Sequence, residues 1–263
     1  MHELAAYVRD LPMWAAALLF LAENVLILLA GVGLGTAVLR LAGAARLLPD
    51  TGRAEPLQLW LAAGAVMLNT GVTLAGWKLW ILGVIRLDLD TTWWIAVDLL
   101  ALLLIMDFAS YVGHALAHRP RLYPLGHRLH HRFVDARPIT LFALHPGEVV
   151  AFGALWLLVL AAAPFSVWAL VGYTVVNLVF GVFGHLGVEP LPARWRRSRF
   201  FAIVATPTMH TMHHLNPARN LGFYTTLWDR LFRTLDDDYD RCRTGHAQLP
   251  ALASAAEPAP RLS

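Results

Sequence analysis

Residues 14–39 read WAAALLFLAENVLILLAGVGLGTAVL, and this run decides the fold class because only Glu23 and Asn24 interrupt it. A helix that crosses a bilayer needs about 20 mostly apolar residues. The run exceeds that length and is too long for the apolar core of a signal peptide, and the segment before it is not basic. We therefore expect a retained membrane helix here.

Four further apolar runs follow, at residues 57–84, 93–113, 149–163 and 165–184. Pro164 separates the last two, and the run at 149–163 is short for a full crossing. This pair either spans the membrane as a tight hairpin or enters it and returns. The sequence therefore predicts an all-α integral membrane bundle with about four to five spans or a re-entrant hairpin.

The composition of the 263 residues agrees with this class: 57% are hydrophobic, 15% are charged, and the mean hydropathy is +0.54. Soluble domains average about 45–50% apolar and about 25% charged residues. The formal net charge of +3 is too small to indicate a nucleic-acid partner, and it fits basic loops at a cytoplasmic membrane face. The single cysteine, Cys242, excludes an internal disulfide and a cysteine-based metal site.

Basic residues set the expected orientation, because loops on the cytoplasmic side carry an excess of Lys and Arg. They concentrate between the first and second runs, after the third run and after the fifth: Arg40, Arg46, Arg53, Arg119, Arg121, Arg128, Arg132, Arg137, Arg194, Arg196, Arg197 and Arg199. Alternating crossings place these three segments in the cytoplasm and the N-terminus on the other side. The segment 236–263 is polar and becomes rich in Ala, Pro and Ser, which predicts a disordered tail.

Histidine boxes carry the chemical signal of this sequence. Residues 114–118 form H-x-x-x-H, and residues 127–131 and 210–214 each form H-x-x-H-H. Positions i, i+3 and i+4 share one face of a helix, so each box is expected to present its imidazoles toward one point. Neutral imidazole is the commonest metal ligand among side chains and suits iron, zinc, copper and nickel alike. Eight box histidines exceed one tetrahedral site, so two metals are expected.

The expected metal ligands are the eight box histidines and His185, which follows the fifth apolar run: His114, His118, His127, His130, His131, His185, His210, His213 and His214. His145 precedes Pro146 and is expected to start a helix or to donate to a ligand rather than to bind metal. Glu148 and Glu189 either accept hydrogen bonds from ligand histidines or are solvated acidic side chains.

Asp107 and Tyr111 precede the first box and form one helical stripe with His114 and His118, since the spacings are four, three and four. Asp107 either orients an imidazole N–H as an outer partner or lies at the membrane interface, solvated by headgroups.

This order of boxes in an apolar chain resembles the fatty acid hydroxylase and sterol desaturase superfamily of integral-membrane di-iron oxygenases. The flanking segments agree: HPGE at 145–148, TPTMH at 206–210, NLG at 220–222 and WDRLF at 228–232. The resemblance covers about residues 107–235. It divides the chain into an N-terminal membrane region at 1–106, a catalytic region at 107–235 with an apolar hairpin at 147–184, and the tail at 236–263.

The resemblance implies two iron ions that activate O2, with zinc as an inactive substitute because zinc has no redox chemistry. It implies hydroxylation of an unactivated C–H bond in a lipid or sterol-like substrate, with desaturation of the same substrates as the alternative. Electrons would come from a separate protein resembling cytochrome b5, a ferredoxin or a reductase. On the resemblance, Asn216 and Asp229 join Asp107 and Tyr111 as expected residues around the ligands.

Two other function classes compete with an enzyme. A metal transporter or metal-storage protein would need polar ligands near the bilayer midplane, whereas these boxes follow the ends of apolar runs. A non-catalytic scaffold has no reason to keep all eight box histidines. We therefore expect a multi-pass membrane enzyme with its boxes and C-terminus in the cytoplasm.

Overall fold

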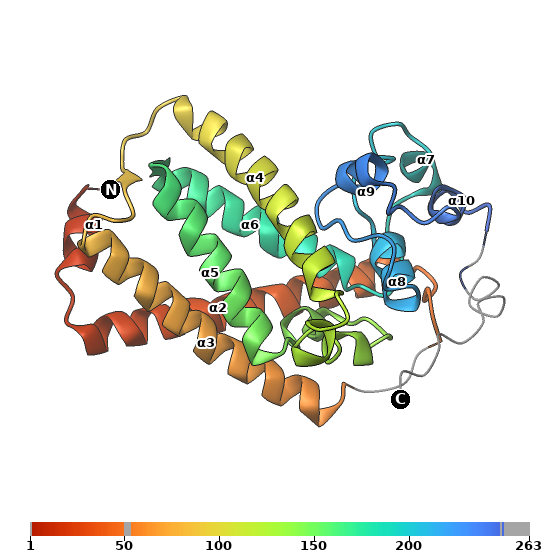
Figure 1. Cartoon of the computed structure of the whole chain (residues 1–263), viewed down its shortest axis with the longest axis horizontal. Coiled ribbons are helices and arrows are strands. Elements are labelled where there is room, and N and C mark those ends of the chain that lie inside the picture. Colours follow the sequence, from red (N-terminus) through yellow and green to blue (C-terminus); the bar gives the residue numbers. More distant parts are fainter. Residues whose placement is uncertain (1, 50–53, 248, 250–263) are drawn as a thin grey trace.

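The structure is a computed structural model that describes residues 2–49, 54–247 and 249. Among these residues, four helices are long and apolar enough to cross a membrane: α2 (Met13–Ala42), α3 (Pro56–Ile81), α4 (Trp94–Ala117) and α6 (Val167–Gly184). A fifth apolar helix, α5 (Pro146–Ala162), has 17 residues and packs against α3. The expected all-α membrane bundle is confirmed (Figure 1).

Local signals set the ends of these helices. Pro56 takes the first position of α3, where its missing N–H costs no hydrogen bond, and the Gln58 side chain accepts from the backbone N–H of Glu55 at 2.9 Å. At the C-terminal end of α2, Gly43 has a φ of 53°. This left-handed conformation, which glycine adopts without strain, ends the helix.

The membrane helices approach one another closely where small residues allow it. A Cβ added at Gly31 of α2 would lie 3.0 Å from Cδ1 of Leu178 of α6, and one at Gly153 of α5 would lie 2.5 Å from Cγ2 of Val72 of α3. Small residues at crossings are the usual way in which membrane helices gain packing contacts. Large apolar side chains such as Leu26, which is 64% exposed, point outward, where lipid would cover them.

The apolar hairpin expected at 147–184 is a pair of helices that separate after their turn. α5 packs against α3, whereas α6 packs against α4 and α2. At the turn, β2 (Phe165–Ser166) pairs in parallel with β1 (Leu87–Asp88), and Asp98 accepts a hydrogen bond from the Ser166 amide at 2.7 Å. This pairing joins two loops at the end of the bundle that also carries α1 (His2–Arg9), as Figure 1 shows.

The opposite end of the bundle carries a cap of short helices: η1 (Tyr123–Leu125), η2 (His130–Arg132), η3 (Pro138–Phe142), α7 (Ala193–Arg196), α8 (Pro207–Leu215), α9 (Leu227–Phe232) and α10 (Tyr239–Thr244). Arg46, from the loop after α2, forms a partly buried ion pair with Asp135 of the cap. The expected boundary after residue 106 falls inside α4. The N-terminal membrane region and the cap are therefore parts of one connected structure.

The prediction of a disordered tail from residue 236 is wrong for the first part of that segment. Tyr239 and Cys242 of α10 are buried in a small apolar cluster with Met209 and Met212 of α8. These few apolar side chains hold the segment on the cap, although its overall composition is polar. Residues 250–263, and Arg53 among the expected loop charges, lie outside the described residues.

Candidate metal centre

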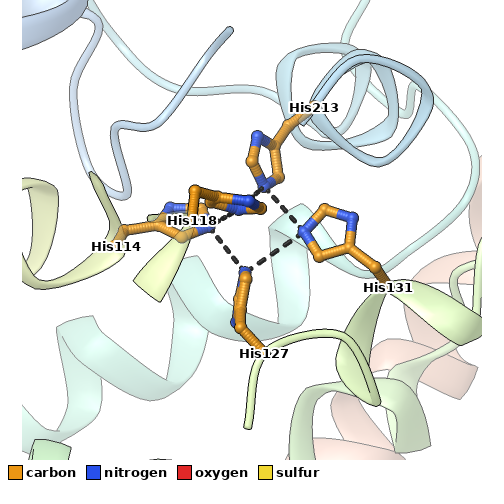
Figure 2. A group of neighbouring side chains, drawn as sticks. All are labelled: His114, His118, His127, His131 and His213. Carbon is orange, nitrogen blue, oxygen red and sulfur yellow. Dashed lines mark hydrogen bonds between the residues drawn. The ribbon is translucent and has the colours of Figure 1, made fainter. Parts of the chain in front are cut away.

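Nine histidines meet where the ends of α4 and α6 contact the cap, and they form two groups. Within each group the candidate ligand atoms all lie within 4.8 Å of one another. The five-histidine group consists of His114, His118, His127, His131 and His213 (Figure 2), and the four-histidine group consists of His130, His185, His210 and His214. All nine residues expected as ligands are therefore brought together.

The expectation that each box converges on one point is confirmed for His114 and His118 of the first box, but it is wrong for the two triple boxes, which are each divided between the two groups. His127 and His131 belong to the five-histidine group and His130 to the other, while His213 is separated from His210 and His214. In both boxes positions i and i+4 stay together. On a helix these positions lie about 40° apart, and position i+3 lies about 100° from i+4. One short segment can therefore serve two neighbouring sites.

Three helix ends position these rings. His118 and His185 follow the last residues of α4 and α6 directly, which places them at the surface of the bundle that faces the cap. At the start of α8 the Thr206 hydroxyl accepts from the Met209 amide at 3.4 Å, and Pro207 takes the first position. The middle box lies on no α-helix, since it runs through a turn into η2.

Ring nitrogens of the five-histidine group face one another at contact distance (Figure 2). Nε2 of His114 lies 3.0 Å from Nε2 of His127, and Nε2 of His213 lies 3.0 Å from Nε2 of His131. Nε2 of His118 lies 3.1 Å from Nε2 of His213. These ring nitrogens surround one small volume, and each is a candidate ligand atom for a metal ion.

Backbone carbonyls determine which ring nitrogen carries the proton. Nδ1 donates to a carbonyl at 2.8 Å in three rings, through the pairs His114–Leu221, His185–Gly181 and His213–Arg219. A neutral imidazole has a single N–H, so each of these bonds leaves Nε2 with a lone pair. The lone pairs are therefore aimed into the centre.

Glu148 fixes His127 in the same tautomer, because its Oε1 accepts a hydrogen bond from Nδ1 of His127 at 2.7 Å. The two side chains are only 7% and 6% exposed. Nε2 of His114 and Nε2 of His127 then face each other with no proton between them, which is repulsive unless a cation lies there. This donor set fits a metal ion, and of the two roles expected for Glu148 the histidine partner is the one observed.

The four-histidine group adjoins the first. Nε2 of His210 lies 3.0 Å from Nε2 of His185 and 3.0 Å from Nε2 of His214. The rings of His131 and His214 stack between the groups with their centroids 4.6 Å apart. The two groups are therefore neighbouring halves of one centre.

Burial keeps seven of the nine rings neutral. Desolvation, reinforced by neighbouring imidazoles, lowers the pKa of His131 to about 2 and the pKa of His118 to about 3. Desolvation also lowers the pKa of His185 to about 4. For the same reason the pKa falls well below 6.5 in His130, His210, His213 and His214. Neutral imidazole is the form that binds metal, so the ligands are ready at neutral pH.

Asp107 takes neither of the roles expected for it, since it is 2% exposed and contacts no histidine among the described residues. It accepts hydrogen bonds from the Tyr224 amide at 3.0 Å, from the Thr225 hydroxyl at 2.6 Å and from Nε1 of Trp228 at 3.0 Å. Asp107 therefore anchors the loop 220–228 to α4.

Four other expected residues also lie away from the ring nitrogens. The Tyr111 hydroxyl lies 3.0 Å from the Thr234 hydroxyl, Asn216 donates to Asp236 at 3.5 Å, and Glu189 accepts from Thr208 at 2.7 Å. The expectation that His145 starts a helix is confirmed, because its Nδ1 accepts from the Gly147 amide at the beginning of α5.

Asp229 supports the carbonyl that orients His114. Its carboxylate is fully buried and accepts from the amides of Leu221 at 2.8 Å and Gly222 at 2.7 Å, and from the Thr234 hydroxyl at 2.6 Å. The Gly222 N–H belongs to the same planar peptide unit as the Leu221 carbonyl, so holding it fixes the direction of that carbonyl, which accepts from Nδ1 of His114. The three-dimensional contacts, not the sequence, reveal this connection.

Asp229→Asn should weaken metal retention by the five-histidine group about 10–100-fold, the usual effect of losing an outer partner of a metal ligand. The amide replaces one of two acceptor oxygens, so Leu221 or Gly222 loses its partner. Metal content after dialysis against graded chelator measures the change. Asp107→Asn loosens the same loop farther from His114 and should lower the melting temperature with metal content retained. Equal metal loss in both variants would contradict the role of Asp229.

A mostly apolar pocket lies beside the four-histidine group at the C-terminal end of α6. Its wall combines residues of α6, of the start of α8 and of the loop 220–228: Phe180, Gly184, His185, Ala205, Thr206, Met209, His210, Gly222 and Phe223. His185 and His210 are its histidines. An apolar molecule in this pocket would touch the edge of the centre.

Comparison with known proteins matches the part of the chain that contains these histidines. The sequence model described as fatty acid hydroxylase matches residues 99–234, a segment that contains all nine histidines. No solved structure matches the chain.

The names of three curated relatives refer to a Delta(7)-sterol, to cholesterol and to very-long-chain aldehydes. A Delta(7)-sterol 5(6)-desaturase of Leptosphaeria maculans is 31% identical over 48% of this chain and 33% of its own length. A cholesterol 25-hydroxylase-like protein of Danio rerio is 30% identical over 52% of this chain and 55% of its own. A very-long-chain aldehyde decarbonylase of Arabidopsis thaliana is 27% identical over 56% of this chain and 25% of its own. The chain thus spans about half or less of the length of these relatives.

Proposed function

The chain belongs to the fatty acid hydroxylase family, and from this premise we propose that it is a membrane-bound di-iron oxygenase. The proposed reaction is the hydroxylation of an unactivated C–H bond in a lipid or sterol-like substrate with O2 and external electrons. The observation that carries the proposal is the pair of buried histidine groups beside an apolar pocket at the membrane end of the cap. That arrangement places candidate metal ligands at the edge of a small pocket whose wall is mostly apolar.

Each histidine group is proposed to hold one iron ion. Bound there, the irons would supply the redox chemistry that activates O2, which histidine-bound zinc would not. Imidazole nitrogen suits iron, and the Nε2 lone pairs already point inward. Zinc would fill the same ligands as an inactive substitute.

The residues of the chain have three tasks in this proposal. The carbonyl of Leu221 and the carboxylate of Glu148 hold the Nδ1–H groups of His114 and His127, so that Nε2 stays a free donor. The rings of Phe180 and Phe223 on the pocket wall exclude water and accept an apolar chain. Burial keeps unliganded rings neutral, so no proton competes at neutral pH.

Hydroxylation would consume one O2, two electrons and two protons, and it would yield an alcohol and one water. The electrons must come from a donor, for which we propose a separate protein of the cytochrome b5, ferredoxin or reductase type. Desaturation of the same substrates would form a C=C bond and two waters. It stays the alternative, because the relative from Leptosphaeria maculans is named a desaturase.

A metal transporter is the less favoured class. Transport sites lie near the bilayer midplane between helices. The nine histidines instead lie at the end of α4, just after α6 and in the cap. They thus form a closed centre at one end of the bundle.

Lipid analysis tests the proposed function. Membranes of cells that express the chain are incubated under 18O2, and lipids that gain one 18O atom or lose two hydrogens are identified by mass spectrometry. A hydroxylase should produce 18O-labelled lipids that are missing from cells expressing His213→Ala. If neither kind of product forms with iron bound and electrons supplied, the proposal is wrong.

We further propose that the cap faces the cytoplasm, with α1 and the β1–β2 loops on the other side. The cap end carries most of the arginines, whereas the loop after α3 carries Arg86 beside Asp88 and Asp90. A cysteine introduced at exposed His246 should react with a membrane-impermeant maleimide only after the cells are opened. Native Cys242 is buried, so the wild-type chain serves as the blank. Labelling in intact cells would reverse the orientation.

A further inference from the structure

Asn177 lies near the middle of α6 with its side chain exposed on the membrane surface of the bundle. The Tyr224 hydroxyl donates to Oδ1 of Asn177 at 2.7 Å, and the Tyr173 hydroxyl lies 2.9 Å from the Tyr224 hydroxyl. Both tyrosines are buried, Tyr224 with 4% and Tyr173 with 6% of its surface exposed. This contact turns Oδ1 inward and leaves the Nδ2 amide group outward, without a partner among the described residues.

An unpaired amide N–H is unfavourable at this depth, because the hydrocarbon core of a bilayer offers no acceptor. The neighbouring polar residue shows the contrast. Thr174 is also exposed on α6, but its hydroxyl donates to the Leu170 carbonyl of its own helix at 2.9 Å. Thr174 is therefore satisfied without a ligand, whereas Asn177 is not.

Asn177 belongs to the same surface as the pocket beside the histidines. Asn177, Phe180 and Gly184 occupy positions i, i+3 and i+7 and share one face of α6, and the last two line the pocket. The Tyr224 ring that orients Asn177 packs edge-to-face on Phe180 at a centroid distance of 5.4 Å. Asn177 precedes His185 by eight residues, which is about 12 Å along a helix.

We propose that Asn177 recognises the substrate by donating a hydrogen bond from Nδ2 to a hydroxyl or carbonyl oxygen of the lipid, while the apolar part of that lipid enters the pocket beside His185 and His210. The inference rests on the proposed function and adds the substrate class to it. The substrate carries an oxygen about 12 Å from the carbon that is oxidised, the helical distance from Asn177 to the centre. A lipid whose only polar group stays in the headgroup region, outside the hydrocarbon core, offers no such oxygen.

Asn177→Leu keeps the size of the side chain and removes the donor. Membranes with wild type, Asn177→Leu or the matched control Thr174→Val are incubated under 18O2, and labelled lipids and iron per chain are measured. Loss of one hydrogen bond should lower the labelled wild-type product about tenfold in Asn177→Leu. Iron content should match wild type in both variants, and Thr174→Val should keep the wild-type product yield.

Tyr224→Phe is the second variant, because it removes the hydroxyl that orients the amide and leaves Asn177 in place. Its product yield should fall between those of wild type and Asn177→Leu. If Asn177→Leu does not fold, the product yield of Tyr224→Phe alone tests the inference. Unchanged amounts and identities of the products in both variants would overturn the inference while the proposed function stands. A wild-type product whose new oxygen is its only oxygen would overturn it as well. If wild type forms neither an 18O-labelled lipid nor a lipid that has lost two hydrogens, both the inference and the proposed function fail.

Discussion

His213→Ala should retain at most one iron per chain where the wild type binds two, and oxidation of lipid should fall by more than about 100-fold, beyond the range for loss of an outer partner. His213 is fully buried in the five-histidine group, with Nε2 3.0 Å from Nε2 of His131 and 3.1 Å from Nε2 of His118. Its removal leaves a gap in the ligand set that no other described side chain fills. Iron per chain and 18O-labelled lipid measure the two effects.

His246→Ala is the control, because His246 is exposed in the cap and contacts the Thr244 hydroxyl at 2.8 Å rather than the centre. It should bind two irons and keep wild-type activity. His213→Asn tests for a packing defect, since it keeps a polar side chain but removes the ring. If His246→Ala lost as much iron as His213→Ala, the assignment of the centre would be wrong.

Mild acid should release the metal and loosen the cap together. Histidines of the centre have folded-state pKa values below 6.5, about 4 for His185 and about 3 for His118, because desolvation disfavours the charged ring. The unfolded chain therefore binds more protons than the folded chain below the unfolded pKa of about 6.5. Stability is complete above that pH and is lost as the pH falls toward the lower values. For fully buried His185 the loss is on the order of 3 kcal/mol.

Several rings titrate in one centre, so the loss should be steeper with pH than a single proton would make it. Bound metal adds to the effect because each ligand must be neutral. Metal release to a colorimetric chelator and the melting temperature are measured from pH 8 to pH 4, for metal-loaded and metal-free protein. The helices α2, α3, α4 and α6 should keep their far-UV signal in acid. Equal melting temperatures of the two forms from pH 5 to 8 would show that metal does not stabilise the cap.

The sequence alone predicted the features that depend on consecutive residues. An apolar run long enough for the bilayer must be helical there, because no water satisfies the backbone, and so the spans α2, α3, α4 and α6 were predictable. The box spacings likewise singled out the histidines that the cap brings together. Composition misled at 236–247, where the buried side chains of Tyr239 and Cys242 are enough to hold a mostly polar segment on the cap.

Only the tertiary structure decided how those histidines are grouped and which groups support them. His130 and His131 are adjacent in the chain and belong to different halves of the centre, because the ring of His130 faces His185 and His214, whereas Nε2 of His131 faces Nε2 of His213. Asp107, chosen from its helical stripe with His114, holds the loop 220–228 instead, while Glu148 and Asp229 support the rings. Periodicity describes the faces of one helix at a time. Which side chain or carbonyl meets those faces depends on segments that are distant in the sequence, and only folding brings them together.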